Sequence, residues 1–315
     1  MPVEAPGTPP LAAIVGPTAS GKTELAMALA RHLPVEIVVA DSRQVYRGMD
    51  LGTAKPDGAA RRGVPHHLLD VADPSQPFTV AEWLARARAI LPQIAGRGRL
   101  PLLVGGTGLY VTALLDGYDF ASQPYAPEIR ERLASELEVE GLAELAARLR
   151  RLDRALAGRI DLRNPRRVLR ALERVEGRGG PVGEGRSEPY PGRVALIGLD
   201  RPRHVLYRRI DERARGLFAA GLLDEVRRLH AAGYGPELGP MSGHGYREAA
   251  RHLAGEWSLD EAIAVTARRT RQYAKRQLTW FRRDRRIVWL PLGDRPADDA
   301  GIVRRALELV RPLFA

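Results

Sequence analysis

The chain has 315 residues, 44% of them apolar, and a formal net charge of +11. A chain of this length and composition can bury a sizeable core, and we expect more than one domain. It contains no cysteine, which excludes disulfides and thiolate zinc sites and fits a cytosolic protein. Residues 1–10 are proline-rich and acidic, and no apolar run approaches the roughly 18 residues that a membrane span requires. We therefore expect a cytoplasmic protein without membrane association.

Lysine is unusually rare in this basic chain. Only Lys22, Lys55 and Lys275 are found among the 49 basic residues. Arginine is a planar fork and lysine a compact point charge on a flexible stem, so a lysine kept against this bias indicates that a guanidinium would not serve there. The three lysines therefore direct attention to the segments around them.

The first predicted element is a strand at residues 11–15, and a helix is expected at residues 24–32. Between them the chain satisfies the pattern G-x-x-x-x-G-K-[ST]. After a strand and before a helix, this pattern predicts a loop whose backbone N–H groups cradle phosphate oxygens. The predicted diphosphate- or nucleotide-binding residues are Gly16, Pro17, Thr18, Ala19, Ser20, Gly21, Lys22 and Thr23.

Two side chains of this loop have predicted roles in chemistry. Lys22 is expected to reach the terminal phosphate, and the Thr23 hydroxyl is expected to hold Mg²⁺. The alternative is a glycine-rich turn without a ligand. The loop alone does not distinguish a nucleotide such as ATP from another diphosphate.

A second strand is predicted at residues 35–40 and a third at residues 100–104. Asp41 directly follows the second strand, at the edge of the sheet where open α/β folds bind ligands, and it is the leading candidate for a general base. Its alternative role is to cap the next helix or to hydrogen-bond the phosphate-loop threonine. Thr107 follows the third strand in the same way, and we expect its hydroxyl to reach the same edge of the sheet and to act there as a catalytic residue. A glycine turn leading into a helix is the alternative for this segment.

Strands alternate with helices in the first part of the chain, since a further helix is expected at residues 80–94. This alternation predicts a parallel sheet with crossover helices. The pattern then becomes purely helical, and a glycine-rich loop at residues 176–192 precedes another strand. We therefore predict an α/β fold with a P-loop NTPase-like parallel sheet core, an inserted all-helical domain and a helical C-terminal region. The predicted insertion helices and later strands are residues 128–138, 141–152 and 165–175, and residues 193–199 and 287–290.

The last helix is expected at residues 300–313, and no internal repeat is visible. The domain boundaries follow from these changes of pattern. We expect residues 1–117 to form the first part of the α/β core and residues 118–192 the insertion. Residues 193–315 are expected to complete the core and to add a basic helical region.

Positive charge is concentrated in two segments. Residues 268–286 hold nine basic residues against the single acid Asp284, and residues 148–178 hold eleven arginines against four acids. Such concentration is typical of a protein with a polyanionic partner, although a solvated helix face is the alternative. Tyr273, Trp280 and Phe281 lie within the first segment, and aromatic side chains offer stacking faces to unpaired bases. We therefore expect nucleic-acid binding, with Arg269, Lys275 and Arg276 as contacts, unless Lys275 and Arg276 brace the core through buried pairs.

Several ordered motifs resemble one family, the bacterial tRNA dimethylallyltransferases, also called tRNA isopentenyltransferases. The resemblance runs from Ile14 to about Leu290. It rests on the phosphate loop with Ala19 and Ser20, and on the segments 41–56, 74–76, 105–110, 245–248 and 272–282. Several such blocks in the right order are more specific than any single one.

The resemblance implies transfer of a dimethylallyl group from dimethylallyl diphosphate to N6 of the adenosine 3′-adjacent to the anticodon, in tRNAs that read codons beginning with U. It also implies the role of Asp41 as the base and an extruded nucleotide in the site. The family's contacts to tRNA would be Asp41, Ser42, Arg43, Gln44 and Thr107, with Arg130, Pro165, Arg166, Arg167, Val168 and Leu169 on the anticodon stem-loop. We expect a monomeric enzyme that uses Mg²⁺.

Two positions depart from the family pattern. Arg163-Asn164 stands where members usually have Asn-Asp, and Arg43 stands where many carry an apolar residue. The first departure bears on the tRNA contacts of the insertion and the second on how the extruded base is packed. The absence of cysteine means that this chain has no C-terminal zinc finger of the eukaryotic kind.

Two other classes of protein have to be weighed. A small-molecule kinase would use the same loop on ATP, but it has no use for the basic segment at residues 268–286. An RNA-dependent ATPase would explain the basic segments but not the ordered blocks around Asp41 and Thr107. A relative that prenylates free adenine nucleotides is disfavoured by the same basic, aromatic segment.

Overall fold

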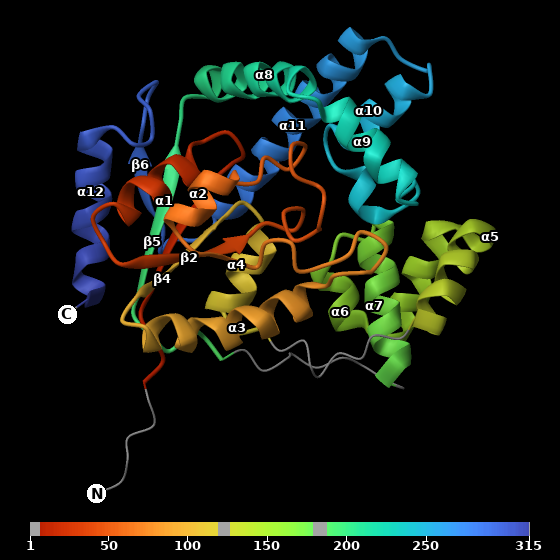
Figure 1. The fold of residues 1–315 in the computed structure, drawn as a ribbon. Helices are drawn as coiled ribbons and strands as arrows, with labels where there is room; N and C mark the ends of the chain where they lie inside the picture. Colours follow the sequence, from red (N-terminus) through yellow and green to blue (C-terminus); the bar gives the residue numbers. More distant parts are fainter. Residues whose placement is uncertain (1–6, 119–126, 179–187, 315) are drawn as a thin grey trace, which may run out of the picture. The chain divides into compact units, whose positions relative to one another are not determined.

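The computed structural model describes residues 7–118, 127–178 and 188–314 (Figure 1). The chain divides into two compact units. The core unit consists of Met1–Leu115 and Tyr190–Ala315, and the insertion consists of Asp116–Pro189. Within the described ranges, no helix combines the length and the apolar character needed to cross a membrane.

The core unit is built on a six-stranded sheet with the strand order β3-β2-β4-β1-β5-β6. Every pair of neighbouring strands is parallel, which confirms the predicted α/β architecture. Parallel sheets are covered on both faces, and the all-buried strands β1 and β4 show the continuous apolar runs expected from that. β2 is also fully buried and is apolar apart from Glu36, which pairs with Arg97 at 2.6 Å. The strands are β1 (Leu11–Val15), β2 (Val35–Ala40), β3 (His66–His67), β4 (Leu100–Gly105), β5 (Val194–Asp200) and β6 (Val288–Pro291).

The sequence pattern located most strands closely. It missed three short elements at residues 58–63, 66–67 and 154–159, and it gave a helix after the glycine turn at residues 105–106 only as an alternative. β1 and β2 have the predicted bounds, whereas β3, with two residues, has no recognisable pattern. Helix α2 (Gly58–Gly63) buries no residue and α4 (Gly108–Leu115) is apolar nearly all round, so neither shows a helical periodicity. The other helices of this half are α1 (Lys22–Ala30) and α3 (Val80–Gly96).

Helix α3 begins where its local sequence specifies. The Thr79 hydroxyl accepts a hydrogen bond from the Glu82 amide, and the Glu82 carboxylate accepts one from the Thr79 amide, which forms a capping box. The buried Trp83 in the first turn donates its indole N–H to the Val39 carbonyl of β2 at 3.0 Å. This contact ties α3 to β2, the strand that ends directly before Asp41.

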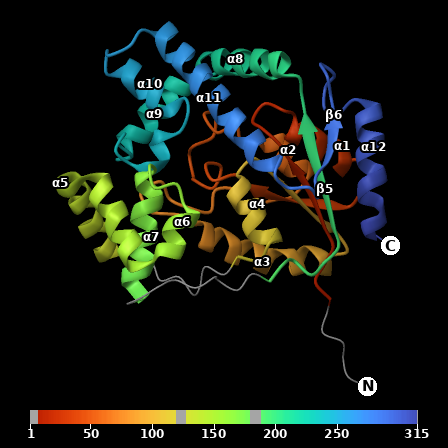
Figure 2. The same ribbon diagram turned by 180° about the vertical axis from the view of Figure 1, so that it is seen from behind.

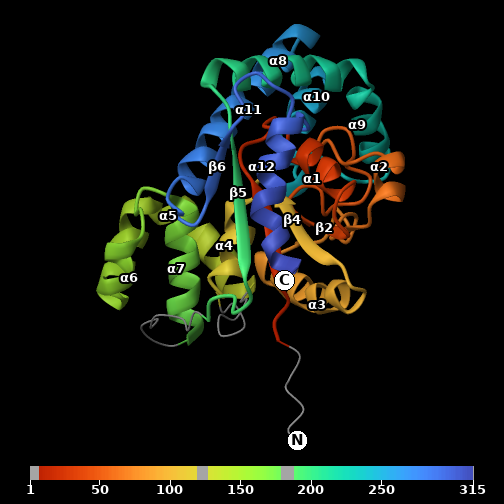
Figure 3. The same ribbon diagram turned by 90° about the vertical axis from the view of Figure 1, so that its left-hand side faces the viewer.

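The second half of the core unit is mainly helical. Leu206 and Ile210 of α8 pack against Ala274 of the long helix α11. Figure 2 shows α11 running from α10 toward β6, and Figure 3 shows α12 alongside β5. The elements are α8 (Arg203–Ala219), α9 (Leu222–Ala231), the 3-10 turn η1 (Gly239–Ser242), α10 (Tyr246–Leu253), α11 (Leu259–Phe281), α12 (Ala300–Val310) and the 3-10 turn η2 (Arg311–Phe314).

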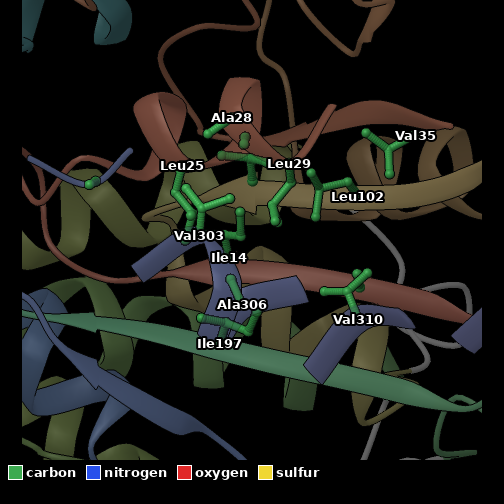
Figure 4. Packing of buried hydrophobic residues seen from close by; sticks show 14 of the residues in the cluster. Ile14, Leu25, Ala28, Leu29, Val35, Leu102, Ile197, Val303, Ala306 and Val310 are labelled. Carbon is green, nitrogen blue, oxygen red and sulfur yellow. The ribbon is translucent and has the colours of Figure 1, made fainter. Parts of the chain in front are cut away.

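The main apolar core lies between the sheet and two helices from opposite ends of the chain. Leu25 and Leu29 of α1 and Val303 and Val310 of α12 pack over Ile14 in the centre of the sheet (Figure 4). All five side chains are at most 6% exposed. The C-terminal helix therefore supports the same helix that follows the phosphate loop.

The insertion is all-helical, as predicted, and has a core of its own. Its helices are α5 (Pro127–Leu152), α6 (Arg154–Arg159) and α7 (Pro165–Arg178). Gly141 has φ 80° and interrupts α5, so this helix has two segments close to the two that were predicted. The buried residues of this unit include Leu133, Leu149, Val168 and Leu172. Part of the loop predicted at residues 176–192 lies outside the described residues.

Candidate active site

A cavity of about 560 Å³ opens in the core unit beside the phosphate loop. Its wall includes Lys22 and Thr23 at the start of α1, Val39 and Asp41 at the end of β2, and Gly105 at the end of β4. All of these lie at the carboxyl ends of parallel strands, which is where open α/β sheets bind ligands. The cavity thus joins the phosphate loop and the candidate base predicted from sequence.

The phosphate loop has the backbone conformation of an anion-binding site. Gly21 lies in the left-handed region with φ 103°, and a Cβ atom there would come within 2.5 Å of the Ala297 side chain. Only glycine fits at this position. Helix α1 begins at the next residue, so the first amide groups of α1 and the positive end of its dipole face the loop.

Lys22 lies at the centre of a charged cluster. Its ammonium group donates a hydrogen bond to the Pro17 carbonyl of the same loop at 2.8 Å. Burial and, to a smaller extent, Arg213 lower the pKa of Lys22 to about 8, against the raising effect of the nearby Asp41 carboxylate. A buried cation with few anionic partners is stabilised by an incoming anion. This arrangement suits the binding of a diphosphate.

Arg213 is the main site residue that the sequence analysis missed. It projects from α8 into the same cavity, and burial lowers its pKa while Asp41 opposes that effect. Arg209, one turn earlier, also lines the cavity and donates to the Ala19 carbonyl at 3.0 Å. Arginines recur throughout this chain, so only their i, i+4 spacing on α8, which places both on one helix face, could have singled them out.

Thr23 and its neighbours provide oxygen atoms that suit a magnesium ion. The Thr23 side chain is exposed to the cavity, and the carboxylates of Glu24, Asp41 and Glu212 also line it. No group of three or more His, Cys, Asp or Glu side chains forms a metal site in the described part of the chain. Mg²⁺ is usually held by one or two protein oxygens together with substrate phosphates and water. The donor set at Thr23 fits that mode of binding.

Asp41 has both a structural contact and an accessible position. One carboxylate oxygen, Oδ1, accepts hydrogen bonds from the Arg43 amide at 2.8 Å and from the Gln44 amide at 3.3 Å. This turn resembles the capping role that was the alternative to catalysis. Because Asp41 also lines the cavity beside Lys22, its second oxygen can face a substrate while the first holds the turn.

Thr107 belongs to a hydrogen-bond chain that connects the ends of β2 and β4. Its amide donates to the Ala40 carbonyl at 3.1 Å, and its hydroxyl accepts from the Ser42 amide at 3.0 Å. The side chain of Tyr273 on α11 lies close to Thr107, and burial raises the pKa of Tyr273 to about 12. Thr107 is therefore fixed next to the turn that holds Asp41.

Gln277 connects the phosphate loop with the glycine-rich segment at residues 105–110. Its side-chain oxygen accepts from the Thr18 amide at 2.8 Å, and its side-chain nitrogen donates to the Gly106 carbonyl at 2.8 Å. A Cβ atom at Gly106 would come within 2.3 Å of that nitrogen. Gln277 was part of a motif predicted from sequence, but its role in joining two loops required the fold.

The departure at Arg43 has a structural explanation. The Arg43 guanidinium donates to the carbonyls of Gly239 and Pro240 at 2.7 and 3.0 Å, and to the Ser242 hydroxyl at 3.2 Å. It thereby ties the Asp41 turn to η1. Gln44 likewise donates from its side chain to the Thr53 carbonyl at 3.0 Å. In this state both side chains hold the walls of the site.

Lys55 serves a structural purpose. Its side chain is 1% exposed, and its ammonium group contacts the Tyr46 carbonyl and the carboxylates of Asp50 and Asp70. A compact ammonium donates to three acceptors in different directions, which a planar guanidinium does not. The lysine at this position thus closes the 46–56 loop that forms one wall of the cavity.

The basic residues of α11 are of two kinds: one forms an ion pair with a buried carboxylate, and others are exposed to solvent. Arg269 forms an ion pair with Glu248, whose side chain is fully buried, and Glu248 also accepts from the Gly245 amide at 2.8 Å. Lys275 and Arg276 are exposed and form no ion pair within the described residues. The predicted RNA contact Arg269 therefore has a bracing role, whereas Lys275 and Arg276 are available to a partner.

The residues of the insertion that were predicted to contact RNA differ in their exposure to solvent. Pro165, Arg166 and Arg167 are exposed at the start of α7, whereas Val168 is fully buried and Leu169 is partly buried. The side chain of Val168 packs in the core of the insertion, so only its backbone is left for the predicted contact with RNA. Arg130 contacts the buried Glu173 at 2.9 Å, and its side chain is half-exposed.

Comparison with known proteins agrees with the geometry. The chain matches the family model for IPP transferase over residues 44–284 and that for isopentenyl transferase over residues 9–70. It is 48% identical to the tRNA dimethylallyltransferase of Syntrophobacter fumaroxidans, covering 95% of this chain and 89% of the relative. The corresponding protein of Roseiflexus castenholzii is also 48% identical, with coverage of 97% and 98%. The crystal structure of the full-length tRNA isopentenylpyrophosphate transferase from Bacillus halodurans is similar with a TM-score of 0.72 and 38% identity, covering 96% of each chain.

Proposed function

The chain belongs to the IPP transferase family, and on this premise we propose that its cavity transfers a dimethylallyl group from dimethylallyl diphosphate to tRNA. The acceptor is N6 of the adenosine 3′-adjacent to the anticodon, in tRNAs that read codons beginning with U. The protein is thus a tRNA-modifying prenyltransferase. The observation that carries the proposal is the juxtaposition of Lys22, Arg213 and Asp41 around one cavity.

The phosphate loop and its cations act on the leaving group. As the C–O bond to the diphosphate breaks, negative charge grows on the diphosphate oxygens. Lys22 and Arg213, with the amides at the start of α1, are already oriented around that position and need little reorganisation. Mg²⁺ held by Thr23 would neutralise part of the same charge when it is bound.

Asp41 acts on the nucleophile. The exocyclic amine of adenine is a weak nucleophile because its lone pair is delocalised into the ring. The free oxygen of Asp41 accepts a hydrogen bond from N6 and takes its proton as the new C–N bond forms. The Arg43 and Gln44 amides hold Oδ1, so they orient the carboxylate without consuming both of its oxygens. Thr107, with Ser42 and Tyr273, forms the adjoining wall for the extruded base.

Exposed cations are available for the RNA. The core unit exposes Lys275 and Arg276 on α11, and the insertion exposes Arg166 and Arg167 on α7. Each pair is accessible to RNA phosphates. Trp280 is 39% exposed and donates to the Thr112 hydroxyl at 3.0 Å, which leaves part of its ring surface for stacking.

The decisive experiment is incubation with labelled dimethylallyl diphosphate and unmodified tRNA, with ATP in a parallel reaction, followed by nucleoside analysis. Label on N6 of the adenosine 3′ to the anticodon is the expected result. Release of phosphate from ATP without prenylation would instead indicate a kinase or an RNA-dependent ATPase. Label on free AMP, with none on tRNA, would move the acceptor to a small nucleotide.

A further inference from the structure

A buried arginine holds the phosphate loop from behind. Arg201 follows β5 directly and is 4% exposed, so it does not line the cavity. Its Nε donates to the Ser20 carbonyl at 2.9 Å. Its Nη1 donates to the carbonyls of Gly293 and Arg295 at 3.2 and 2.8 Å. One guanidinium thus connects the phosphate loop with the loop between β6 and α12.

The contact with Ser20 acts on one particular peptide unit. The Ser20 carbonyl and the Gly21 N–H belong to the same trans peptide and point in opposite directions. Within the described residues the Gly21 N–H has no protein acceptor, and Gly21 precedes the first residue of α1. A donor on the carbonyl side polarises the peptide and strengthens hydrogen bonds made by its N–H, by about 10–30% per bond.

The charge of Arg201 has no direct acidic partner among the described residues. All three of its hydrogen bonds go to backbone carbonyls, and its Nη2 has no acceptor. Burial and the nearby Arg209 lower its pKa, against the raising effect of the more distant Glu24 and Asp294 carboxylates. A buried cation without a carboxylate is costly, and neutral donors would satisfy carbonyls at less cost. An anion bound on the other side of the same loop would offset this cost. The placement therefore points to a role in anion binding.

We propose that Arg201 is a positioning residue for the diphosphate: it fixes and polarises the Ser20–Gly21 peptide so that the Gly21 N–H faces the leaving group. The identity of that leaving group rests on the proposed function. Arg209 assists by donating to the adjacent Ala19 carbonyl at 3.0 Å while paired with Glu24 at 2.8 Å. Two guanidiniums therefore hold consecutive carbonyls of the loop, Arg201 from behind it and Arg209 from the wall of the cavity.

The test compares Arg201→Gln, which removes the charge, with Arg201→Lys, which keeps the charge but cannot reach all three carbonyls. Arg193→Gln is the matched control, because Arg193 donates to the Pro312 and Leu313 carbonyls, near the start of the strand that Arg201 follows. The measurements are the Kd for inorganic pyrophosphate with Mg²⁺, kcat and KM for dimethylallyl diphosphate, the Kd for tRNA, and Tm.

Arg201→Gln is expected to weaken pyrophosphate binding and lower kcat/KM by about 10- to 100-fold, as for other residues that orient a direct ligand-binding group. Arg201→Lys should weaken pyrophosphate binding and lower kcat/KM by several-fold. The Kd for tRNA should stay within twofold of the wild-type value for both variants. If Arg201→Gln does not fold, the lysine variant decides the question.

Pyrophosphate affinity and kcat/KM within twofold of the wild type in a folded Arg201 variant would overturn the proposal. So would equal losses of pyrophosphate and tRNA affinity together with a lower Tm, because they would indicate a purely structural role. If the wild-type protein binds pyrophosphate but prenylates no tRNA, the proposed function fails while the effect of Arg201 on pyrophosphate can still be measured.

Discussion

Lys22 is the residue whose chemistry can be tested most directly. It is proposed to stabilise charge on the leaving diphosphate, so Lys22→Ala should lower kcat by about 10²- to 10³-fold, the typical cost of removing a preorganised donor. Lys22→Arg should also be impaired, because the guanidinium does not fit between the Pro17 carbonyl and Arg213. Steady-state kinetics with tRNA in excess measure both effects. A fully active arginine variant would contradict the assigned role.

The lowered pKa of Lys22 adds a pH dependence. In the folded protein this group loses its proton near pH 8, well below the usual 10.5, so kcat/KM for dimethylallyl diphosphate should fall as the pH rises above about 8. Between pH 8 and 10.5 the unfolded chain binds the proton that the folded chain has lost. The contribution of Lys22 to stability should therefore rise with pH in this window. In Lys22→Arg the alkaline fall in kcat/KM should disappear, and a pH–rate profile of both proteins checks this.

Two substitutions at Asp41 distinguish its proposed role in catalysis from its structural role in the turn. Asp41→Asn keeps an oxygen that can accept from the Arg43 and Gln44 amides, so the turn and the Tm should be preserved while transfer falls by orders of magnitude. Asp41→Ala removes the acceptor as well and should lower both Tm and activity. Calorimetry and single-turnover assays distinguish the two variants. An asparagine variant that loses stability and activity in proportion would assign Asp41 a purely structural role.

At the level of residues, motifs were predictable and the long-range contacts were not. The phosphate loop, Asp41 and Thr107 each directly follow a predicted strand, so their common location at the sheet edge followed from topology. Arg201 and Arg213 reach the loop from residues about two hundred positions away, in a sequence where arginine is common. No local pattern marks such contacts, since they depend on tertiary packing.

Among the elements, α11 contains a residue that braces the core, Arg269, and two exposed residues that are proposed to bind RNA, Lys275 and Arg276. Replacing Lys275 and Arg276 by alanine should weaken tRNA binding and reduce the log–log salt slope by roughly 0.7–0.9 for each phosphate that the protein no longer neutralises. Affinity for pyrophosphate should stay within a few-fold, since the phosphate loop is untouched. Arg304→Ala is a suitable control, because Arg304 is an exposed arginine on α12. Titrations of tRNA at several salt concentrations measure the slopes.

Arg269→Ala should behave differently from its neighbours on α11. Removing this side chain leaves the buried Glu248 without its cation, which typically costs about 3–5 kcal/mol of stability. The Tm of Arg269→Ala should therefore be lower than that of the wild type, whereas the Tm of the Lys275 and Arg276 variants should be unchanged. An unchanged salt slope together with reduced stability in the Lys275 and Arg276 double variant would argue that the whole helix is structural.

Helices and strands were predictable from the sequence where their residues are buried along one face or along their whole length. β1 and β2 were predicted from their short apolar and β-branched runs, and every residue in them is buried. α3 was predicted as a helical stretch, and the structure adds the capping box at its start. α2 buries nothing and β3 is two residues long, so sequence periodicity carried no signal for either. The missed elements all lie between the predicted ones and did not change the topology.

For the whole molecule, the ends of the insertion meet on the core unit. The Tyr190 amide donates to the Leu115 carbonyl at 2.9 Å, so a short glycine linker can replace residues 116–189. We expect the shortened protein to fold and to bind pyrophosphate within a few-fold of the full chain, because each unit has its own core. Its tRNA affinity should fall at least tenfold. Loss of pyrophosphate binding or of cooperative unfolding would show that the insertion stabilises the core unit.

The scarcity of lysine makes the protein a selective target for amine-reactive labels. Lys55 is buried and should react slowly, whereas Lys275 is exposed and Lys22, with a pKa near 8, is partly an unprotonated nucleophile at neutral pH. Pyrophosphate should protect Lys22, and tRNA should protect Lys275. A single mass spectrum of the labelled chain would then report the occupancy of each substrate separately, without any engineered probe.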